Sequence, residues 1–562
     1  MMQFANEVFD SPGSSISADI CIIGAGAAGI VIALELIDSG LDVLLLESGE
    51  LRPVAATQAL YAGQVVDERL HSPPDRYRQR RFGGTTTIWG GRCVPFDAID
   101  FERRDYVADS GWPFGFEELQ PFYPRANRLC EAGRFAYTVE SAFDHAPRPM
   151  IEGFASPHFT TSTLERFSCP TDFGARYGKK LRSAANVRVL LNANVTALRL
   201  DPAGRRITAA DVKTAAGHTQ RVEARRFVLA TGGLEVARLL LASSDVHPQG
   251  IGNDHDVVGR YYMCHIAGTI GSLKISPAVW HGYDVSDEGV YCRRRFALRA
   301  ETQRSLKLGN FVARLHHPRI TDPAHRNAIL SLLFLARPLI PYEYAKRLHG
   351  DVHVDLRSWL SHVANVATGP MDAVSFAWRM LKDRKLAERK FPSIIIKSKA
   401  NLYSLDFHAE QQPNRLSRVM LTDDRDPCGV PRIKVDWRYT RGDVDTAGRS
   451  LALLAEDFKQ SGAGTFDFDP ASVEFEMTRY GAYGGHHIGT ARMGTNPATS
   501  VVDAQCRVHG VDNLYIAGSA TFPTSSQANP TLTIVALALR LAERLRKESR
   551  AADAVPTMAL AL

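Results

Sequence analysis

Residues 18–47 read ADICIIGAGAAGIVIALELIDSGLDVLLLE, and this stretch decides the fold. It predicts an apolar strand over Ile20–Ile23, a glycine-rich turn, a helix, and a second apolar strand over Val43–Leu46. This order of elements, with an acidic residue ending the second strand, is typical of a dinucleotide-binding βαβ unit. We therefore expect an α/β fold whose first unit holds a dinucleotide.

The glycines of this turn have separate predicted tasks. Gly24 permits the tight turn, Gly26 lets the backbone approach a pyrophosphate, and Gly29 lets helix and strand pack closely. The helix N-terminus, which includes Ala27 and Ala28, offers N–H groups and a positive dipole end to the phosphates. Glu47 can accept hydrogen bonds from ribose hydroxyls. The alternative is a glycine-rich turn in another kind of α/β fold.

Composition narrows the class of protein. The chain has 562 residues, is 45% hydrophobic and 23% charged, and carries a formal net charge of +6. No basic run is interleaved with aromatic residues, so we expect no nucleic-acid partner. Residues 1–17 lack the features of a signal peptide, and residues 20–37 fit strand and helix better than a membrane span. The eight cysteines are scattered without zinc-site spacing, as in reduced cytoplasmic proteins.

Further segments suggest how the chain is organised. Residues 81–92 hold four glycines and three threonines, so we expect a loop without a stable helix. Residues 187–200 predict two strands around a turn. Strand–turn–helix patterns follow at 226–242 and 513–545, and both could return to the nucleotide-binding sheet.

The region between residues 270 and 480 has a different pattern. Alternating runs over Asn401–Ala409 and Ser417–Leu421 predict antiparallel strands. Residues 353–391 are expected to be helical. Within them, residues 379–390 hold six basic residues against two acidic ones, which fits a solvated helix face or a contact with an anionic surface.

Two positions could carry acid–base chemistry. His486 and His487 lie between glycine pairs, where flexible backbone lets a side chain enter a cleft. Histidine is the usual general base near neutral pH, and no metal-ligand spacing accompanies this pair. Asn529 precedes Pro530 at a predicted helix start, where asparagine also serves as an N-cap.

The order of these blocks resembles the glucose–methanol–choline (GMC) flavoprotein oxidoreductases. The matching segments are GAGAAG with Glu47, GGTTTIWGG at 83–91, LATGGLEVARLLL at 229–241, HHIGTARMG at 486–494, VHGVDNLYIAGSATFPT at 508–524 and ANPTLT at 528–533. Residues 270–480 carry less of the match. The Asn-Pro-Thr-Leu-Thr ending and Trp89 are most similar to the pyranose oxidase and sugar (glycoside) dehydrogenase branch.

The resemblance implies FAD as the dinucleotide and assigns roles by motif. His486 takes the catalytic histidine position of the HxxGT motif, and Asn529 takes the second catalytic position. His487 and Gln527 are expected near substrate. Residues expected to contact FAD are Gly24, Gly26, Ala27, Ala28, Gly29, Glu47, Ser48, Arg81, Gly83, Gly84, Thr85, Trp89, Gly90, Gly91, Val195, Ala230, Gly518, Ser519, Asn529 and Thr531.

The implied reaction is oxidation of an alcohol to the carbonyl. The resemblance favours a secondary ring hydroxyl of a sugar or glycoside as the alcohol. His486 acts as general base and hydride passes to flavin N5. Ile88 replaces the histidine that binds FAD covalently in some relatives, so we expect non-covalent FAD. Oxygen, a quinone or a redox protein could reoxidise the flavin. The turn leaves open whether His486 or His487 faces the flavin.

The resemblance also divides the chain. A Rossmann-like FAD-binding domain is expected from residues 15–115, 185–270 and 480–550. An α+β substrate domain on an antiparallel sheet is expected from residues 116–184 and 271–479, with a tail at 551–562. The competing interpretations are a nicotinamide-dependent dehydrogenase, an inactive flavin-binding protein, a GMC-fold lyase, and an oxidoreductase of non-sugar alcohols.

Overall fold

The predicted βαβ unit is present and begins the larger sheet. The computed structural model describes residues 1–9, 16–145, 147–340, 355–393, 395, 396, 398, 401–479 and 482–553. Strand β2 (Ile16–Ile23) leads into helix α2 (Ala27–Glu35), and β3 (Val43–Leu46) returns parallel to β2. The apolar runs form strands because both faces of a parallel sheet are buried.

Around this unit, the described residues build a sheet of eight strands. Their order is β1-β8-β3-β2-β11-β10-β9, with β22 beside β11. The strands not yet given are β1 (Met2–Phe4), β8 (Val187–Leu191), β9 (Asn194–Leu200), β10 (Ile207–Lys213), β11 (Thr219–Leu229) and β22 (Leu514–Ile516). The segment before the βαβ unit supplies an edge strand, because Met2–Phe4 pairs in parallel with β8.

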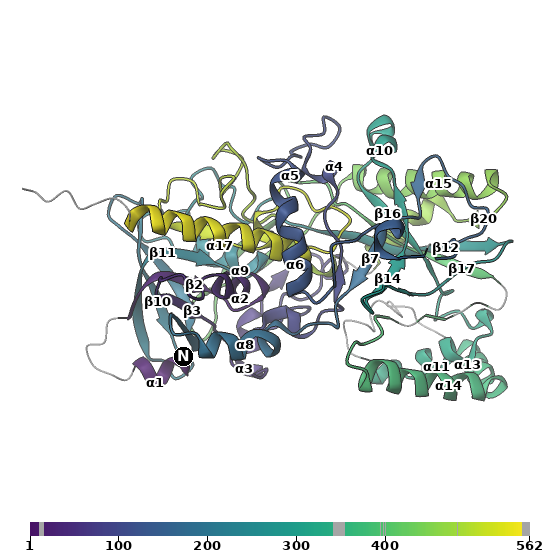
Figure 1. Cartoon of the computed structure of the whole chain (residues 1–562), viewed down its shortest axis with the longest axis horizontal. Helices are drawn as coiled ribbons and strands as arrows, with labels where there is room; N and C mark the ends of the chain where they lie inside the picture. The colour runs from purple at the N-terminus through teal and green to yellow at the C-terminus, as the bar shows by residue number, and fades with distance from the viewer. Residues whose placement is uncertain are drawn as a thin grey trace, which may run out of the picture.

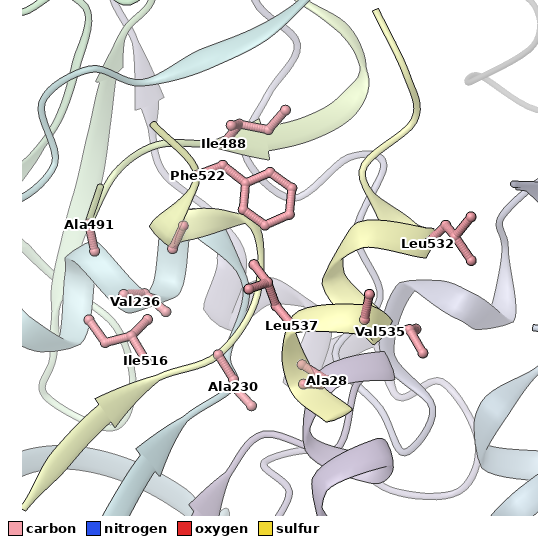
Figure 2. Packing of buried hydrophobic residues seen from close by; sticks show 14 of the residues in the cluster. Ala28, Ala230, Val236, Ile488, Ala491, Ile516, Phe522, Leu532, Val535 and Leu537 are labelled. Carbon is pink, nitrogen blue, oxygen red and sulfur yellow. The ribbon is translucent and has the colours of Figure 1, made fainter. Parts of the chain in front are cut away.

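Helices cover this sheet and close its core. Helix α17 (Thr531–Asp553) packs against α2, and α9 (Gly233–Ala242) follows the end of β11. Figure 2 shows Val535 and Leu537 of α17 close to Ala28 of α2, with Ala230 and Ile516 to the left of Ala28. Residues from three distant segments therefore meet at the carboxyl ends of the strands, where open α/β sheets bind ligands.

A second sheet forms the other half of the molecule (Figure 1). It runs β20-β12-β17-β16-β15-β6, with β21 paired to β12, in the described part of the chain. Its strands are β6 (Phe159–Thr160), β12 (Met263–Ile275), β15 (Phe296–Leu298), β16 (Phe311–His316), β17 (Leu402–Ala409), β20 (Gly464–Asp467) and β21 (Tyr483–Ile488). The pairing is antiparallel, as the alternating runs predicted.

The two halves meet at β12 and β21. Strand β21, which carries both candidate histidines, pairs with β12 although the expected boundary at residue 480 assigns it to the nucleotide domain. Strand β12 crosses the expected boundary at residue 270. All the predicted domain boundaries stay predictions. The paired strands hold the histidines between the two halves.

Smaller elements complete the fold. One sheet has the order β13-β14-β7-β5 and another β18-β19-β4. Their strands are β4 (Gln64–Val65), β5 (Arg92–Cys93), β7 (Leu164–Phe167), β13 (Asp284–Val285), β14 (Tyr291–Arg294), β18 (Arg418–Arg425) and β19 (Pro431–Asp436). Further helices are α6 (Tyr123–Leu129), α8 (Phe173–Ser183), α10 (Ala300–Leu306), α15 (Arg441–Gln460) and α16 (Val473–Thr478).

Three helices form a group at one end of the molecule, below the antiparallel sheet in Figure 1. They are α11 (Ala328–Leu335), α13 (Leu356–Thr368) and α14 (Pro370–Met380), and a π-helical turn continues to Leu386. The helical prediction over 353–391 holds from Leu356 to Leu386, where Gly369 and Pro370 divide it into two helices. Residues 387–391 are not helical, and residues 353 and 354 lie outside the described residues. Within the described ranges, no helix has the length and apolar character needed to cross a bilayer.

Candidate active site

A cavity of about 670 Å³ lies where the two halves meet. Its wall combines the end of β2, both glycine loops, β9, the start of α9, β21 and the start of α17. The predicted site residues that line it are Gly24, Gly26, Ala27, Ala28, Glu47, Ser48, Arg81, Gly84, Thr85, Trp89, Gly90, Val195, Ala230, His486, His487, Gly518, Ser519, Asn529 and Thr531.

The first glycine loop is held by close backbone contacts. Gly24 has a φ of 103°, and a Cβ placed on it would lie 2.6 Å from the carbonyl oxygen of Ala230. A Cβ on Gly29 would lie 1.9 Å from the carbonyl oxygen of Gly24. On Gly84, in the second glycine loop, a Cβ would lie 2.9 Å from Gly26 Cα. Because these glycines have no side chain, the backbones of the strand, the helix and the second loop can pack in direct contact.

Other glycines leave room for a ligand. A Cβ placed on Gly26, Gly90, Gly232 or Gly518 would meet no heavy atom of the described residues within 4 Å, and all four border the cavity. Gly26, Ala27 and Ala28 at the start of α2 line this space, and no described side chain caps that helix. An FAD molecule needs such a cradle for its pyrophosphate, so the residues present fit the cofactor.

Glu47 has a structural task in addition to its predicted one. One carboxylate oxygen accepts a hydrogen bond from the Ala25 N–H at 2.9 Å, and the other accepts from the Gly49 N–H at 2.7 Å. The carboxylate therefore fixes the first glycine loop against the end of β3. It also lines the cavity, where its remaining lone pairs can meet a ligand.

The second glycine loop, expected to be a loop without a stable helix, contains one short turn. Gly84–Thr87 form a 3₁₀ turn, entered through Gly83 with a φ of 94°. The turn is possible because the Thr86 hydroxyl donates to the Gly83 carbonyl at 2.6 Å and the Thr87 hydroxyl to the Gly84 carbonyl at 2.9 Å. Local side-chain bonds of this kind stabilise turns that glycine alone leaves loose.

Four residues predicted to contact cofactor or substrate lie behind the cavity wall. Gly29, Gly83 and Gly91 are not among the lining residues and instead allow close packing. Gln527 is buried outside the lining, where its amide accepts from Arg295 at 3.1 Å and donates to Asp97 at 3.4 Å. A substrate contact of Gln527 is therefore not supported. Gln527 and Asn529 lie two residues apart, but their side chains have different partners: Arg295 and Asp97 for Gln527, His486 for Asn529.

His486 and Asn529 face each other in the cavity wall. His486 comes from β21, Asn529 directly precedes Pro530 and the start of α17, and Asn529 Nδ2 lies 3.2 Å from His486 Nε2. The amide nitrogen donates, so Nε2 presents a lone pair in this pairing. Burial, with a smaller effect of the Arg92 charge, lowers the pKa of His486 to about 4. A neutral imidazole with a lone pair is the form that can take a proton.

His487 belongs to a different hydrogen-bond system. Its Nδ1 lies 2.6 Å from the Tyr262 hydroxyl, which lies 2.7 Å from His71 Nε2. His71 Nδ1 donates to the Ser72 carbonyl at 2.6 Å, so the Tyr262 hydroxyl donates to His71 and accepts from His487. The remaining Nε2 of His487 then carries a lone pair. Burial lowers the pKa of His487, which keeps the ring neutral.

Cys264 belongs to the same hydrogen-bond system as His487 and Tyr262. Its thiol lies 3.2 Å from the Tyr262 hydroxyl, and burial raises its pKa to about 12. The ligand atoms of His71, Cys264 and His487 lie within 4.8 Å of one another. The Tyr262 hydroxyl bonds to all three of these groups, so hydrogen bonding accounts for their proximity. All eight cysteines, each in the described part of the chain, are free thiols.

A buried ionic network was missed by the sequence analysis. Arg78 and Arg80 reach Glu235 at 3.2 and 3.1 Å, and Arg238 reaches both Glu235 and Asp426. Burial alone would raise the pKa of Glu235, but Arg238, Arg78 and Arg80 lower it to about 2. Three guanidinium groups against two carboxylates leave positive charge on the cavity wall. The signal was the arginine-rich segment RYRQRR directly before the second glycine loop.

Comparison with known proteins agrees with this geometry. The model of the family described as FAD dependent oxidoreductase matches residues 19–349, and the model described as GMC oxidoreductase matches residues 413–538. The chain belongs to the GMC family of FAD-dependent oxidoreductases. This GMC oxidoreductase is thus an FAD-dependent enzyme that oxidises CH–OH groups.

Full-length relatives share this organisation. The fructose dehydrogenase large subunit of Gluconobacter japonicus is 26% identical, over 94% of this chain and 98% of its own length. The 6'''-hydroxyparomomycin C oxidase of Streptomyces lividus is 26% identical, over 93% of this chain and 90% of its own. The crystal structure of pyridoxine 4-oxidase from Mesorbium loti has a TM-score of 0.53 at 18% identity, covering 94% of this chain and 98% of that one. This last similarity shows the fold.

Proposed function

We propose that this GMC oxidoreductase oxidises a secondary ring hydroxyl of a sugar or glycoside to the carbonyl, with FAD bound non-covalently. The observation that carries the proposal is the pair of His486 Nε2 and Asn529 Nδ2, 3.2 Å apart in the wall of a glycine-lined cavity. A base and a hydrogen-bond donor that converge on one point suit an alcohol, whose oxygen must lose a proton and stay in place.

The two side chains divide the work at the substrate oxygen. His486 Nε2 takes the hydroxyl proton, because its lowered pKa leaves the ring neutral at physiological pH. Asn529 Nδ2 donates a hydrogen bond to the same oxygen as negative charge develops on it. When bound in this cavity, FAD would supply the two-electron acceptor for the hydride that leaves the substrate carbon. Both side chains are placed in advance, so binding the substrate orients it for reaction.

The residues proposed to hold FAD follow the cavity from one end to the other. The Gly26 backbone and the start of α2 receive the pyrophosphate, and Glu47 and Val195 border the space for the adenosine. Gly518 and Thr531 lie on the side of the catalytic pair. Ile88 lines the cavity where a covalent attachment in some relatives uses a histidine, and its side chain forms no bond to a flavin.

Support for the substrate class comes from relatives and from polar residues in the cavity wall. The two full-length relatives named above carry a sugar and an aminoglycoside in their names. In this chain, Tyr77, Gln79, Tyr283 and Ser393 also line the cavity, and their polar groups can bond to ring hydroxyls. A cytoplasmic location stays a prediction from the sequence.

The test is an anaerobic visible spectrum of the purified holoenzyme before and after addition of a panel of sugars and glycosides. Flavin bands that bleach with a sugar support the proposal and identify the substrate class. Bleaching only by non-sugar alcohols would show that the substrate is an alcohol other than a sugar or glycoside. Bands that persist with every alcohol would point to lyase chemistry and contradict the proposed oxidation.

A further inference from the structure

The helical group at the end of the molecule exposes an unusual number of apolar side chains. Of the eighteen large apolar side chains that are exposed in the described residues, ten lie between residues 339 and 386. They include Trp359, which is 45% exposed, and Trp378, which is 63% exposed. We define the apolar helix face by its members on two helices: Leu356, Trp359, Leu360 and Val363 on α13, and Met371, Val374, Trp378 and Leu381 on α14 and its end.

The exposure follows helical periodicity on both helices. On α13 the exposed positions are spaced by three, one and three residues, whereas His362 points inward and stacks on Phe334 with ring centroids 4.0 Å apart. On α14 the buried positions are Ala373 and Phe376. Each helix thus has one face packed into the protein and an opposite apolar face in solvent. Contiguous exposed apolar patches usually mark an interaction site.

Basic residues accompany this face. Residues 355–390 contain seven Lys or Arg residues and four Asp or Glu residues. Arg379, Lys382 and Lys390 are exposed and follow Trp378 along the chain. Arg389 differs, because its guanidinium donates to the Phe167 carbonyl at 2.9 Å and the Glu131 carbonyl at 3.1 Å. Arg389 therefore holds this segment to the rest of the protein. Arg379, Lys382 and Lys390 place positive charge next to the apolar helix face.

We propose that the apolar helix face docks onto the surface of an anionic phospholipid bilayer. Amphipathic helices with Trp and Leu on one side and Lys or Arg beside them lie in the interface of such bilayers. Tryptophan rings prefer the headgroup level, and basic side chains meet anionic headgroups. The two tryptophans and Met371 would also suit a protein interface, but the adjoining Lys382 and Lys390 favour a bilayer, because lysine is depleted at protein–protein interfaces.

Docking at this face would connect to the wall of the cavity. The chain leaves the helical group at Leu386, is held to the body through Arg389, and reaches the cavity wall at Pro392 and Ser393. The Ser393 hydroxyl lies 2.7 Å from the Tyr283 hydroxyl, which also lines the cavity. The bilayer contact and the cavity wall are thus joined by a short anchored segment. This inference does not depend on the identity of the substrate.

The experiment measures binding of the holoenzyme to vesicles of phosphatidylglycerol and phosphatidylcholine and to vesicles of phosphatidylcholine alone. We expect cosedimentation with the anionic vesicles, weaker binding at high salt, and a blue shift of tryptophan fluorescence. The double variant Trp359→Glu with Trp378→Glu should bind about a hundredfold more weakly, because two aromatic side chains no longer enter the interface.

A matched control separates the face from a general charge effect. Leu416 and Phe475 are 61% and 62% exposed and lie outside the apolar helix face, so Leu416→Glu with Phe475→Glu makes the same change in charge. This control should bind anionic vesicles like the wild type. Flavin absorbance and Tm, measured for both variants, verify that each is folded.

Three outcomes would overturn the proposal. The first is a wild-type holoenzyme that does not bind anionic vesicles. The second is equal loss of binding in the face variant and the matched control. The third is a stable dimer in sedimentation analysis that only the face variant dissociates, which would assign the face to a second copy of the chain.

Discussion

His486 Nε2 lies 3.2 Å from Asn529 Nδ2, although 43 residues separate the two along the chain. β21 of the antiparallel sheet carries the histidine, and the asparagine precedes a helix that packs on the nucleotide-binding unit. The proposed catalytic pair therefore forms only when both halves of the molecule are in place. Replacing either side chain should therefore change flavin reduction in a way that can be measured separately.

Replacing Asn529 should impair flavin reduction but leave the cofactor bound. We expect Asn529→Ala to slow anaerobic flavin reduction by about a hundredfold, because one donor to the developing negative charge is lost. Asn529→His, which restores a donor, should recover part of the rate. The measurement is stopped-flow absorbance with saturating substrate. Equal rates for Asn529→Ala and the wild type would remove Asn529 from the mechanism.

The pH dependence should reflect the buried imidazole. The pKa of His486 falls from its usual value of 6.5 to about 4, so the ring is neutral above that range. We expect the rate of flavin reduction to stay level from pH 8 down to about pH 5 and to decline below it. The same shift predicts that the contribution of His486 to stability is complete above pH 6.5 and is lost as the pH falls towards 4.

Tm recorded at each pH is the control, since it separates loss of reactivity from unfolding. A reduction rate that already falls with an apparent pKa near 6.5 would contradict the assignment of a buried neutral His486.

Gly26→Ala should weaken FAD binding without harming the fold. Gly26 has a φ of −82°, which alanine adopts, and the added Cβ would enter the cavity without meeting a described atom. Only the ligand is then displaced. We expect FAD affinity to fall by at least about tenfold at unchanged apoprotein Tm, measured by fluorescence titration and thermal unfolding. Gly448→Ala, in the interior of α15, is the control and should leave FAD affinity unchanged. Unaltered affinity in Gly26→Ala would place the pyrophosphate elsewhere.

Acid precipitation should release all the flavin into solution. Ile88 lines the cavity and its hydrocarbon side chain cannot attach to the isoalloxazine ring. We expect a colourless protein pellet and a supernatant whose absorbance accounts for one FAD per chain. Flavin that remains with the pellet would disprove non-covalent binding and require another attachment residue.

The nucleotide unit was predictable because its signals are local. Strand, turn and helix over residues 18–47 depend on apolar runs and on glycines at fixed spacing, and β2, α2 and β3 follow that pattern. The strand pair over residues 187–200 was likewise predicted from a short apolar pattern. Local sequence did not predict the 3₁₀ turn at Gly84–Thr87, which depends on bonds from threonine side chains.

Contacts between residues far apart in the sequence were harder to predict. The network around Glu235 joins α9 to residues before the second glycine loop, and no sequence pattern pairs them. Choosing between the adjacent histidines also required the fold. Strand β21 turns one ring towards Asn529 and the next towards Tyr262, because neighbouring side chains of a strand point to opposite faces.

The most direct test of the central claim compares anaerobic flavin reduction in His486→Ala and His487→Ala. Both variants should retain FAD, verified by absorbance. The account predicts that His486→Ala slows flavin reduction by about a hundredfold or more, because the general base is lost, while His487→Ala slows it by less than about tenfold. The reverse order, or full activity in His486→Ala, would contradict the assignment of His486 as the base.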